Sequence, residues 1–191
     1  MNILATVDFA NQEKMHLVNE FFPSNLDAEI FNLFKQFYIG NSKWQEQAEY
    51  AHQQGRYVYQ GKCEATDKLI DFASNNDGMT MMENIIGQAV EFRGYSLWAD
   101  TAGYEITPHY DLAPFDVTIQ IYMTDPVRNF EMMGTAVYED GTNKLLFEIP
   151  YKRNSGYIMN TCHRIWHGLH HAIPLDYSRY SVYLRYKKVN K

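Results

Sequence analysis

The chain has 191 residues, carries a formal net charge of −6, and is 46% hydrophobic and 21% charged. This length fits one domain and the composition can bury a core, while the negative charge argues against a nucleic-acid binder that relies on a broad basic surface. No apolar run approaches the roughly 20 residues of a membrane-spanning helix, and the first residues lack the basic and apolar blocks of a secretory signal. Two cysteines, Cys63 and Cys162, are too few for a disulfide framework or a cysteine-based zinc site. We therefore expect a single cytoplasmic domain over residues 1–191.

The first half of the sequence is predicted to be mainly helical. The apolar residues of the segment 26–37 recur at three- and four-residue spacing after a Pro-Ser-Asn start signal, which is typical of an amphipathic helix. Further helices are expected over Ala65–Ala73 and, more weakly, over Met81–Ala89. The polar stretch 45–54 fits either a loop or an exposed helix.

The second half changes to short runs rich in β-branched and aromatic residues, separated by Gly, Pro and Asn turn signals. These runs are 95–98, 116–123, 135–138, 144–149, 156–161 and 180–186. Short strands at this spacing predict an antiparallel sandwich or barrel. The sequence therefore indicates an α+β fold, in which helices within 1–90 brace a sheet built from about 91–191.

One short motif in the second half suggests metal chemistry. In an extended strand residues i and i+2 face the same side, so His109 and Asp111 can both reach one metal ion. His167, in Trp-His-Gly, is the best candidate for a third ligand from another strand. Two histidines and one carboxylate suit non-haem Fe(II), because they leave the other coordination positions open. A lone His-x-Asp triplet is more often a surface pair, so the motif depends on its companions.

A basic residue in the last predicted strand is such a companion. Arg179 follows His167 by a short interval, and arginine presents a planar fork that binds a carboxylate with two parallel hydrogen bonds. A dicarboxylate co-substrate could be anchored there.

Five segments between Tyr95 and Tyr186 occur in the order of a known family. They are Gly103–Asp111, Val117–Met123, Gly134–Tyr138, Gly156–Gly168 and Arg179–Ser181. Together they resemble the Fe(II)- and 2-oxoglutarate-dependent dioxygenases of the prolyl-hydroxylase type, in particular the compact members from bacteria and phages. The resemblance covers about half of the chain and implies a double-stranded β-helix, or jelly roll, with N-terminal supporting helices.

The resemblance also implies roles for single residues. His109, Asp111 and His167 would bind Fe(II), and Arg179, with Tyr122 and Ser181, would bind the far carboxylate of 2-oxoglutarate. The implied reaction consumes O₂, converts 2-oxoglutarate to succinate and CO₂, and hydroxylates a substrate. A peptidyl prolyl or another amino-acid C–H bond is favoured as the target, in a peptide or a small molecule.

Several alternatives stay open from the sequence. His170 and His171 lie nearer to Arg179 than His167 does and could replace it as the distal ligand. The same jelly roll could belong to a non-enzymatic cupin- or lectin-like binding protein. Arg185, six residues after Arg179, is reminiscent of nucleic-acid-dealkylating dioxygenases, although the acidic chain disfavours a nucleic-acid partner.

Overall fold

The structure is a computed structural model that describes residues 1–9, 13–47, 54–111, 115–124, 133–160 and 164–189. Within these residues the helices are α1 (Ser24–Phe34), α2 (Glu64–Ser74) and α3 (Asn76–Ile86). The strands are β1 (Asn2–Asp8), β2 (Lys14–Asn19), β3 (Trp44–Glu46), β4 (Arg56–Tyr59), β5 (Val90–Asp100), β6 (Val117–Tyr122), β7 (Ala136–Tyr138), β8 (Leu145–Glu148), β9 (Ser155–Met159), β10 (His167–Gly168) and β11 (Arg179–Lys188).

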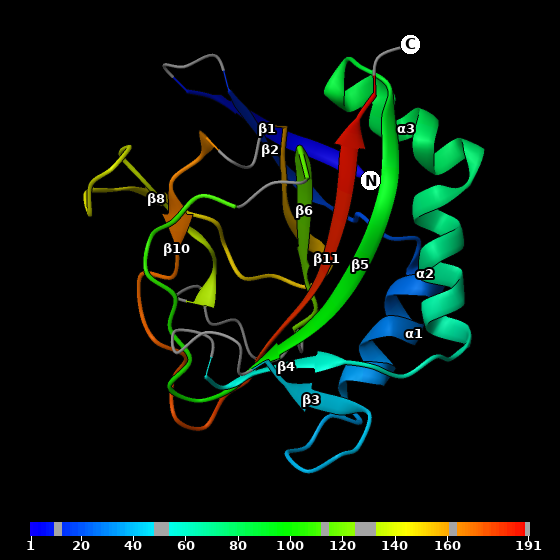
Figure 1. The fold of residues 1–191 in the computed structure, drawn as a ribbon, viewed down its shortest axis with the longest axis vertical. Coiled ribbons are helices and arrows are strands. Elements are labelled where there is room, and N and C mark those ends of the chain that lie inside the picture. The colour runs from blue at the N-terminus through cyan, green and yellow to red at the C-terminus, as the bar shows by residue number, and fades with distance from the viewer. Residues whose placement is uncertain (10–12, 48–53, 112–114, 125–132, 161–163, 190–191) are drawn as a thin grey trace.

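The strands form two antiparallel sheets. The larger has the order β1-β2-β9-β6-β11-β5-β4-β3, and the smaller has the order β10-β7-β8. The helices cover one face of the larger sheet, and the smaller sheet lies on its opposite side (Figure 1). Both halves of the sequence contribute to the larger sheet, which therefore joins the N-terminal and C-terminal parts of the chain.

The prediction that residues 1–90 are helical is wrong in part, because β1 to β4 lie there. These strands are defined by their partners: β2 pairs with β9, and β4 pairs with β5. Such long-range pairing overrides weak local preference and cannot be read from spacing alone. The polar stretch 45–54 overlaps β3, while its residues 48–53 lie outside the described part of the chain.

The predicted helices are present with shifted ends. The third begins at Asn76 rather than Met81, because the side chain of Asn75 accepts a hydrogen bond from the backbone N–H of Gly78 and caps the helix. It ends at Gly87, whose φ of +74° is the left-handed conformation that glycine adopts readily at a helix C-terminus. All six strands predicted in the second half are observed, and the two-residue strand β10 is added to them.

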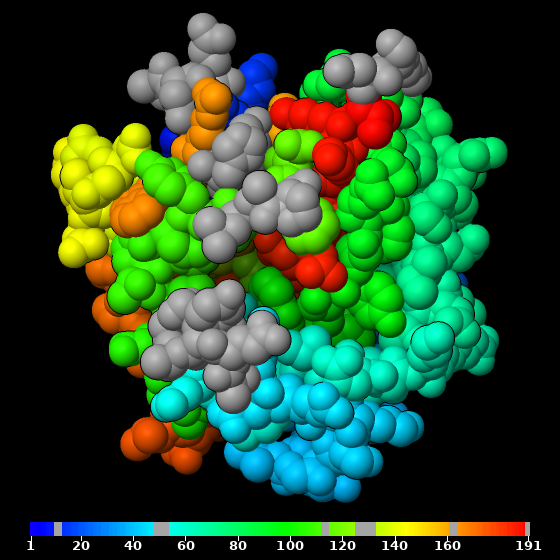
Figure 2. All heavy atoms as spheres, in the orientation of Figure 1, coloured from blue at the N-terminus to red at the C-terminus, as the bar shows by residue number. Residues whose placement is uncertain are grey.

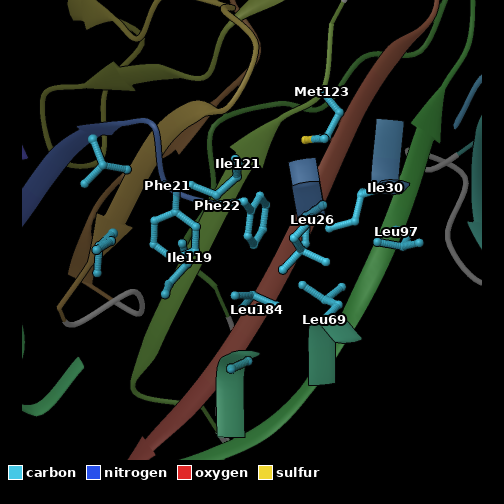
Figure 3. Close-up of a cluster of buried hydrophobic side chains, with 14 of the residues drawn as sticks. Phe21, Phe22, Leu26, Ile30, Leu69, Leu97, Ile119, Ile121, Met123 and Leu184 are labelled. Carbon is cyan, nitrogen blue, oxygen red and sulfur yellow. The ribbon is translucent and has the colours of Figure 1, made fainter. Parts of the chain in front are cut away.

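The larger sheet separates two hydrophobic cores. Between it and the helices lies a core of aliphatic and phenylalanine side chains, in which Leu26, Ile30 and Leu69 of the helices meet Leu97 and Leu184 of the sheet (Figure 3). Between the two sheets lies a second core that is rich in tyrosine. Its members include Tyr104, Tyr122, Tyr151 and Tyr157.

Candidate functional site

The backbone places two histidines side by side at the edge of the smaller sheet. The N–H of His109 donates to the carbonyl of His167 at 2.9 Å, and the N–H of His167 donates back to the carbonyl of His109 at 3.0 Å. Gly168 makes the approach possible, because a Cβ at this position would lie 2.7 Å from the carbonyl oxygen of Ile106. The two imidazole rings are consequently 4.8 Å apart between centroids.

Each histidine uses one ring nitrogen to fix the ring. Nδ1 of His109 lies 2.9 Å from the carbonyl oxygen of Thr107, and Nδ1 of His167 lies 2.8 Å from that of Ile165. Since a carbonyl only accepts, each Nδ1 carries the proton and each Nε2 keeps a lone pair. This arrangement, with Nδ1 bonded to a carbonyl, is the usual one for histidines that bind a metal through Nε2.

Asp111 completes the cluster, with different roles for its two oxygens. Oδ1 lies 3.8 Å from Nε2 of His109 and 3.7 Å from Nε2 of His167. Oδ2 instead accepts hydrogen bonds from the hydroxyl of Tyr183 at 2.8 Å and of Thr118 at 3.2 Å. The carboxylate is therefore held from one side while its other oxygen faces the two imidazoles.

These three side chains form the one group in the described residues that could hold a metal ion, with ligand atoms within 4.8 Å of one another. The predicted trio His109, Asp111 and His167 is thus brought together. The alternatives His170 and His171 are exposed and lie outside the group. Burial lowers the pKa of His109 to about 4, and the neighbouring imidazole of His167 is the second cause that lowers it. The imidazole of His109 is therefore neutral and able to act as a ligand near pH 7.

The cluster opens into a cavity of about 140 Å³. Its wall is formed by polar and aromatic side chains, by two apolar ones, by Gly168 and by the cluster itself: Arg56, Trp98, Gln120, Thr135, Tyr157, Arg179 and Tyr183, then Ile106 and Leu169, and then His109, Asp111 and His167. On the face of the molecule drawn in Figure 2 the centre is hollowed, and β11 (red) is visible beside the hollow next to β5 (green).

Arg179 lies in the wall of this cavity and is only 2% exposed. Its guanidinium donates from Nε to the carbonyl of Met133 at 2.7 Å, from Nη1 to Asp100 at 2.8 Å and from Nη2 to the hydroxyl of Thr135 at 3.0 Å. Burial opposes the charge, but Tyr122 and Asp100 more than offset it, so the pKa of Arg179 is raised. The group is a fixed, permanent cation.

A second buried arginine, which the sequence analysis did not identify, shares the same carboxylate. Arg56 donates from Nε to Oδ1 of Asp100 at 2.6 Å and from Nη2 to Oδ2 at 3.0 Å. Arg56, Asp100 and Arg179 lie directly opposite one another on β4, β5 and β11, so their side chains share one face of the sheet. Burial acts against the charge here too, yet Asp100 raises the pKa of Arg56.

Tyr122 and Ser181, the other predicted contacts of a co-substrate, are both fully buried, and neither lines the cavity. The hydroxyl of Tyr122 donates to Thr135 at 2.9 Å, and Ser181 accepts from the side-chain amide of Gln120 at 3.0 Å. Thr135 and Gln120 do line the cavity. The two predicted residues therefore contact the wall of the cavity from behind.

Aromatic side chains connect the arginine end of the cavity with the metal cluster. The ring of Trp98 lies between the guanidinium of Arg56, 4.0 Å from its centroid, and the ring of Tyr183, whose centroid is 4.3 Å away. Tyr183 in turn bonds Asp111. Trp98 and Tyr183 each lie between two apolar residues of their strands. This alternation was the only feature of the sequence that indicated their position in the site.

Comparison with known proteins finds a similar fold but no similar sequence. No model of a known protein family matches the sequence, and no curated protein matches it either. Among solved structures, a prolyl-4-hydroxylase from Pseudomonas putida superposes with a TM-score of 0.67 at 12% identity, over 92% of each chain. HygX from Streptomyces hygroscopicus, with nickel, 2-oxoglutarate and hygromycin B bound, gives 0.60 at 8% identity, over 92% of this chain and 83% of that chain.

A third solved structure points in the same direction. A prolyl hydroxylase from Trichoplax adhaerens, in complex with a peptide fragment of the hypoxia-inducible-factor oxygen degradation domain, superposes with a TM-score of 0.55 at 17% identity, over 91% of this chain and 83% of that chain. The chain therefore has the fold of the iron- and 2-oxoglutarate-dependent oxygenases, which confirms the predicted jelly roll.

Within the described residues, no helix combines the length and the apolar character needed to cross a bilayer.

Proposed function

We propose that the protein is an Fe(II)- and 2-oxoglutarate-dependent oxygenase that hydroxylates an amino-acid C–H bond, in a peptidyl proline or another side chain. The observation that carries this proposal is that one small cavity contains both the His109–Asp111–His167 cluster and the buried cation of Arg179. A jelly roll that merely binds a metal has no use for a second, anion-binding group in the same cavity. A dicarboxylate co-substrate that chelates the metal requires both.

The donor set suits the metal. Two neutral imidazole nitrogens and one carboxylate oxygen are the ligands by which non-haem Fe(II) is held with open positions. HygX, whose structure contains nickel and 2-oxoglutarate, has the same fold. Bound Fe(II) and 2-oxoglutarate would supply the oxidation of a C–H bond by O₂, with release of succinate and CO₂.

The charges of the cavity also favour a metal together with a dianion. Arg56 and Arg179 contribute two positive charges, and Asp100 and Asp111 contribute two negative charges, so these four groups sum to zero. A divalent metal adds two positive charges to these groups. A dicarboxylate such as 2-oxoglutarate restores neutrality, which matters because unbalanced buried charge is costly.

Arg179 is the residue that we assign to the far carboxylate. Within the described residues, three of the five N–H groups of its guanidinium donate to Met133, Asp100 and Thr135, which leaves one N–H on each terminal nitrogen for a ligand. The hydroxyl of Thr135 accepts from Arg179 and Tyr122 and donates to Gln120, so the one donor and both acceptor sites of this hydroxyl are used. Tyr122 and Ser181 would thus act indirectly, by orienting the wall, rather than by touching the ligand.

The rest of the cavity would orient and shield the reaction. Tyr183 and Thr118 hold one oxygen of Asp111 and so direct the other toward the metal. Ile106 and Leu169 form an apolar part of the wall and limit the access of water.

Because the metal and 2-oxoglutarate would together occupy the cavity of about 140 Å³, the substrate must approach from its open side. The neighbouring folds include a prolyl hydroxylase with a peptide bound and HygX with hygromycin B bound. We favour a peptide or small molecule that offers an amino-acid C–H bond. A reduced, cytoplasmic setting remains a prediction from the two cysteines.

Titration of 2-oxoglutarate into the anaerobic, Fe(II)-loaded protein tests the proposal. Wild type should bind it with a weak visible charge-transfer band, and Arg179→Ala should weaken binding by roughly tenfold to a hundredfold, since a charge-assisted hydrogen bond is worth about 1.5–3 kcal/mol. Arg179→Lys should recover only part of this loss, because an ammonium lacks the planar fork. Fe(II) affinity without co-substrate should stay unchanged.

Arg153→Lys provides a matched control, because Arg153 pairs with Asp27 outside the cavity. It should bind 2-oxoglutarate as wild type does. Failure of wild type to bind 2-oxoglutarate would favour a non-enzymatic binding protein. If wild type does bind 2-oxoglutarate, its turnover in the presence of peptidyl proline, free amino acids or nucleobases would identify the substrate.

A further inference from the structure

The row Arg56–Asp100–Arg179 across β4, β5 and β11 has a property that the metal cluster does not explain. Asp100 is completely buried, and both of its oxygens are engaged by arginine. Oδ1 accepts from Arg56, whereas Oδ2 accepts from Arg56 and from Arg179. One carboxylate thus bonds two guanidinium groups, of which each lines the cavity.

The contact with Asp100 fixes the direction of the Arg179 guanidinium. Its three engaged nitrogens have acceptors on two segments: Met133 and Thr135 just before β7, and Asp100 on β5. Asp100 provides the only charged acceptor of the three, and charge-assisted hydrogen bonds are about twice as strong as neutral ones. The orientation of the other two N–H groups of Arg179, which would donate to a ligand, therefore depends mainly on the carboxylate of Asp100.

Arg56 in turn makes the burial of Asp100 possible. A carboxylate with no exposed surface is strongly destabilising unless it is paired and fully hydrogen-bonded. Arg56 meets it with a two-bond fork and is itself held between the rings of Trp98 and Tyr104, at 4.0 and 4.6 Å from their centroids. The strand β4 thus supports a group of the C-terminal strand β11.

We propose that Asp100, fixed by Arg56, is a positioning residue that sets the orientation of Arg179 for the far carboxylate of 2-oxoglutarate. This inference rests on the proposed function and adds a role for β4, a strand of the N-terminal half. Asp100 itself does not touch the ligand. Asp100 acts through Arg179, so its substitution should weaken only the binding of the far carboxylate of 2-oxoglutarate.

Two ligands that differ at this far end separate positioning from general support. 2-Oxoglutarate and 2-oxovalerate have the same 2-oxo acid group and the same number of carbons, but 2-oxovalerate ends in a methyl group. Both can chelate Fe(II), and only 2-oxoglutarate can use Arg179. The ratio of the two affinities, measured by anaerobic titration of the Fe(II)-loaded protein, therefore reports on the orientation of Arg179.

Asp100→Asn is the first variant. Because three arginine N–H groups converge on the two oxygens of Asp100, an amide NH₂ in either orientation must face at least one of them. We expect the affinity for 2-oxoglutarate to fall by tenfold or more, and that for 2-oxovalerate to change by less than about twofold. Arg56→Lys keeps the charge but loses the fork, so a smaller loss in the same direction is expected.

The double variant Arg56→Gln with Asp100→Asn guards against a folding failure. It removes one positive and one negative charge, so the net charge of the row is the same as in wild type. Arg179 still loses its charged acceptor, and the preference for 2-oxoglutarate should remain reduced. Thermal unfolding of each variant shows whether the comparison is made on folded protein.

Three results would overturn the inference. Unchanged or tighter binding of 2-oxoglutarate by Asp100→Asn and by the double variant would mean that Arg179 is oriented without the carboxylate. An equal loss for both ligands would mean a purely structural role. If wild type itself showed no preference for 2-oxoglutarate over 2-oxovalerate, the proposed function would fail, and this inference with it.

Discussion

The two faces of the larger sheet are made by the same strands but differ in their chemistry. On β11, Val182 and Leu184 point toward the helices, whereas Arg179, Ser181 and Tyr183 point toward the smaller sheet. The first face packs against aliphatic and phenylalanine side chains, and the second carries hydrogen-bonded tyrosines and buried ions and contacts the metal cluster through Tyr183. A strand of period two can thus divide stability and chemistry between alternate residues, so that each set can change with limited effect on the other.

The largest functional effect should come from removing a ligand of the cluster. His109→Ala and Asp111→Ala should each abolish the visible charge-transfer band of the Fe(II)–2-oxoglutarate complex, because the metal loses one of three protein ligands. Anaerobic absorption spectra measure this directly. His170→Ala is the control and should keep the band, since His170 lies outside the cluster; a band that survives in both ligand variants would refute the assignment.

The largest effect on stability should come from the opposite face of the same sheet. Leu184 is fully buried between β11 and the helices, so Leu184→Ala should lower the free energy of unfolding by about 2–5 kcal/mol. Denaturant titration measures the loss. The fraction that stays folded should bind Fe(II) as wild type does, and a destabilised protein with a weakened metal site would show that the faces are not independent.

Two tyrosines on β11 allow the same substitution to be compared on both faces. Tyr183→Phe removes a hydrogen bond to Asp111 and should weaken Fe(II) binding by about tenfold. Tyr186→Phe removes a hydrogen bond to the carbonyl of Ala73 in α2 and should instead lower stability by about 1 kcal/mol. Metal titration and thermal unfolding of both variants should give opposite patterns; identical patterns would contradict the division.

The smallest effect is expected for the second donor to Asp111. The hydroxyl of Thr118 is 3.2 Å from Oδ2, against 2.8 Å for Tyr183, so Thr118→Val should weaken Fe(II) binding only a few-fold. Because both hydroxyls serve one oxygen, the double variant should lose more than the product of the single losses. Metal titration of the three variants tests this, and simple additivity would mean that the donors act separately.

The sequence was sufficient for the parts of the fold that local pattern specifies. Runs of β-branched and aromatic residues predicted the strands of the second half, and helical spacing predicted α1 and α2. The strands β2 and β4 were missed, because each becomes a strand through pairing with a partner far away in the chain. The composition of β2 (Lys-Met-His-Leu-Val-Asn) does not distinguish it from a helix, whereas β4 (Arg-Tyr-Val-Tyr) carries the aromatic and β-branched residues typical of a strand and was missed although this signal was present.

The same distinction applies to the site. His109 and Asp111 were identified because two residues on one strand face must point the same way. Arg56 and Asp100 were missed, since they are 44 residues apart and Asp100 is 79 residues from Arg179. One signal was present: Asp100 follows Trp98 at the same-face position, just past the predicted run 95–98, and a carboxylate buried there requires a partner.

The reciprocal backbone hydrogen bonds between His109 and His167 have a consequence for folding. They close a long loop of chain, and loop closure is opposed by entropy until further contacts reward it. A metal ion bound by both imidazoles would act as a cross-link across the same closure and stabilise only the closed form. Since a ligand of the native state stabilises it by mass action, the midpoint of thermal unfolding should rise with the concentration of free Fe(II), and a chelator should make this end of the smaller sheet open first.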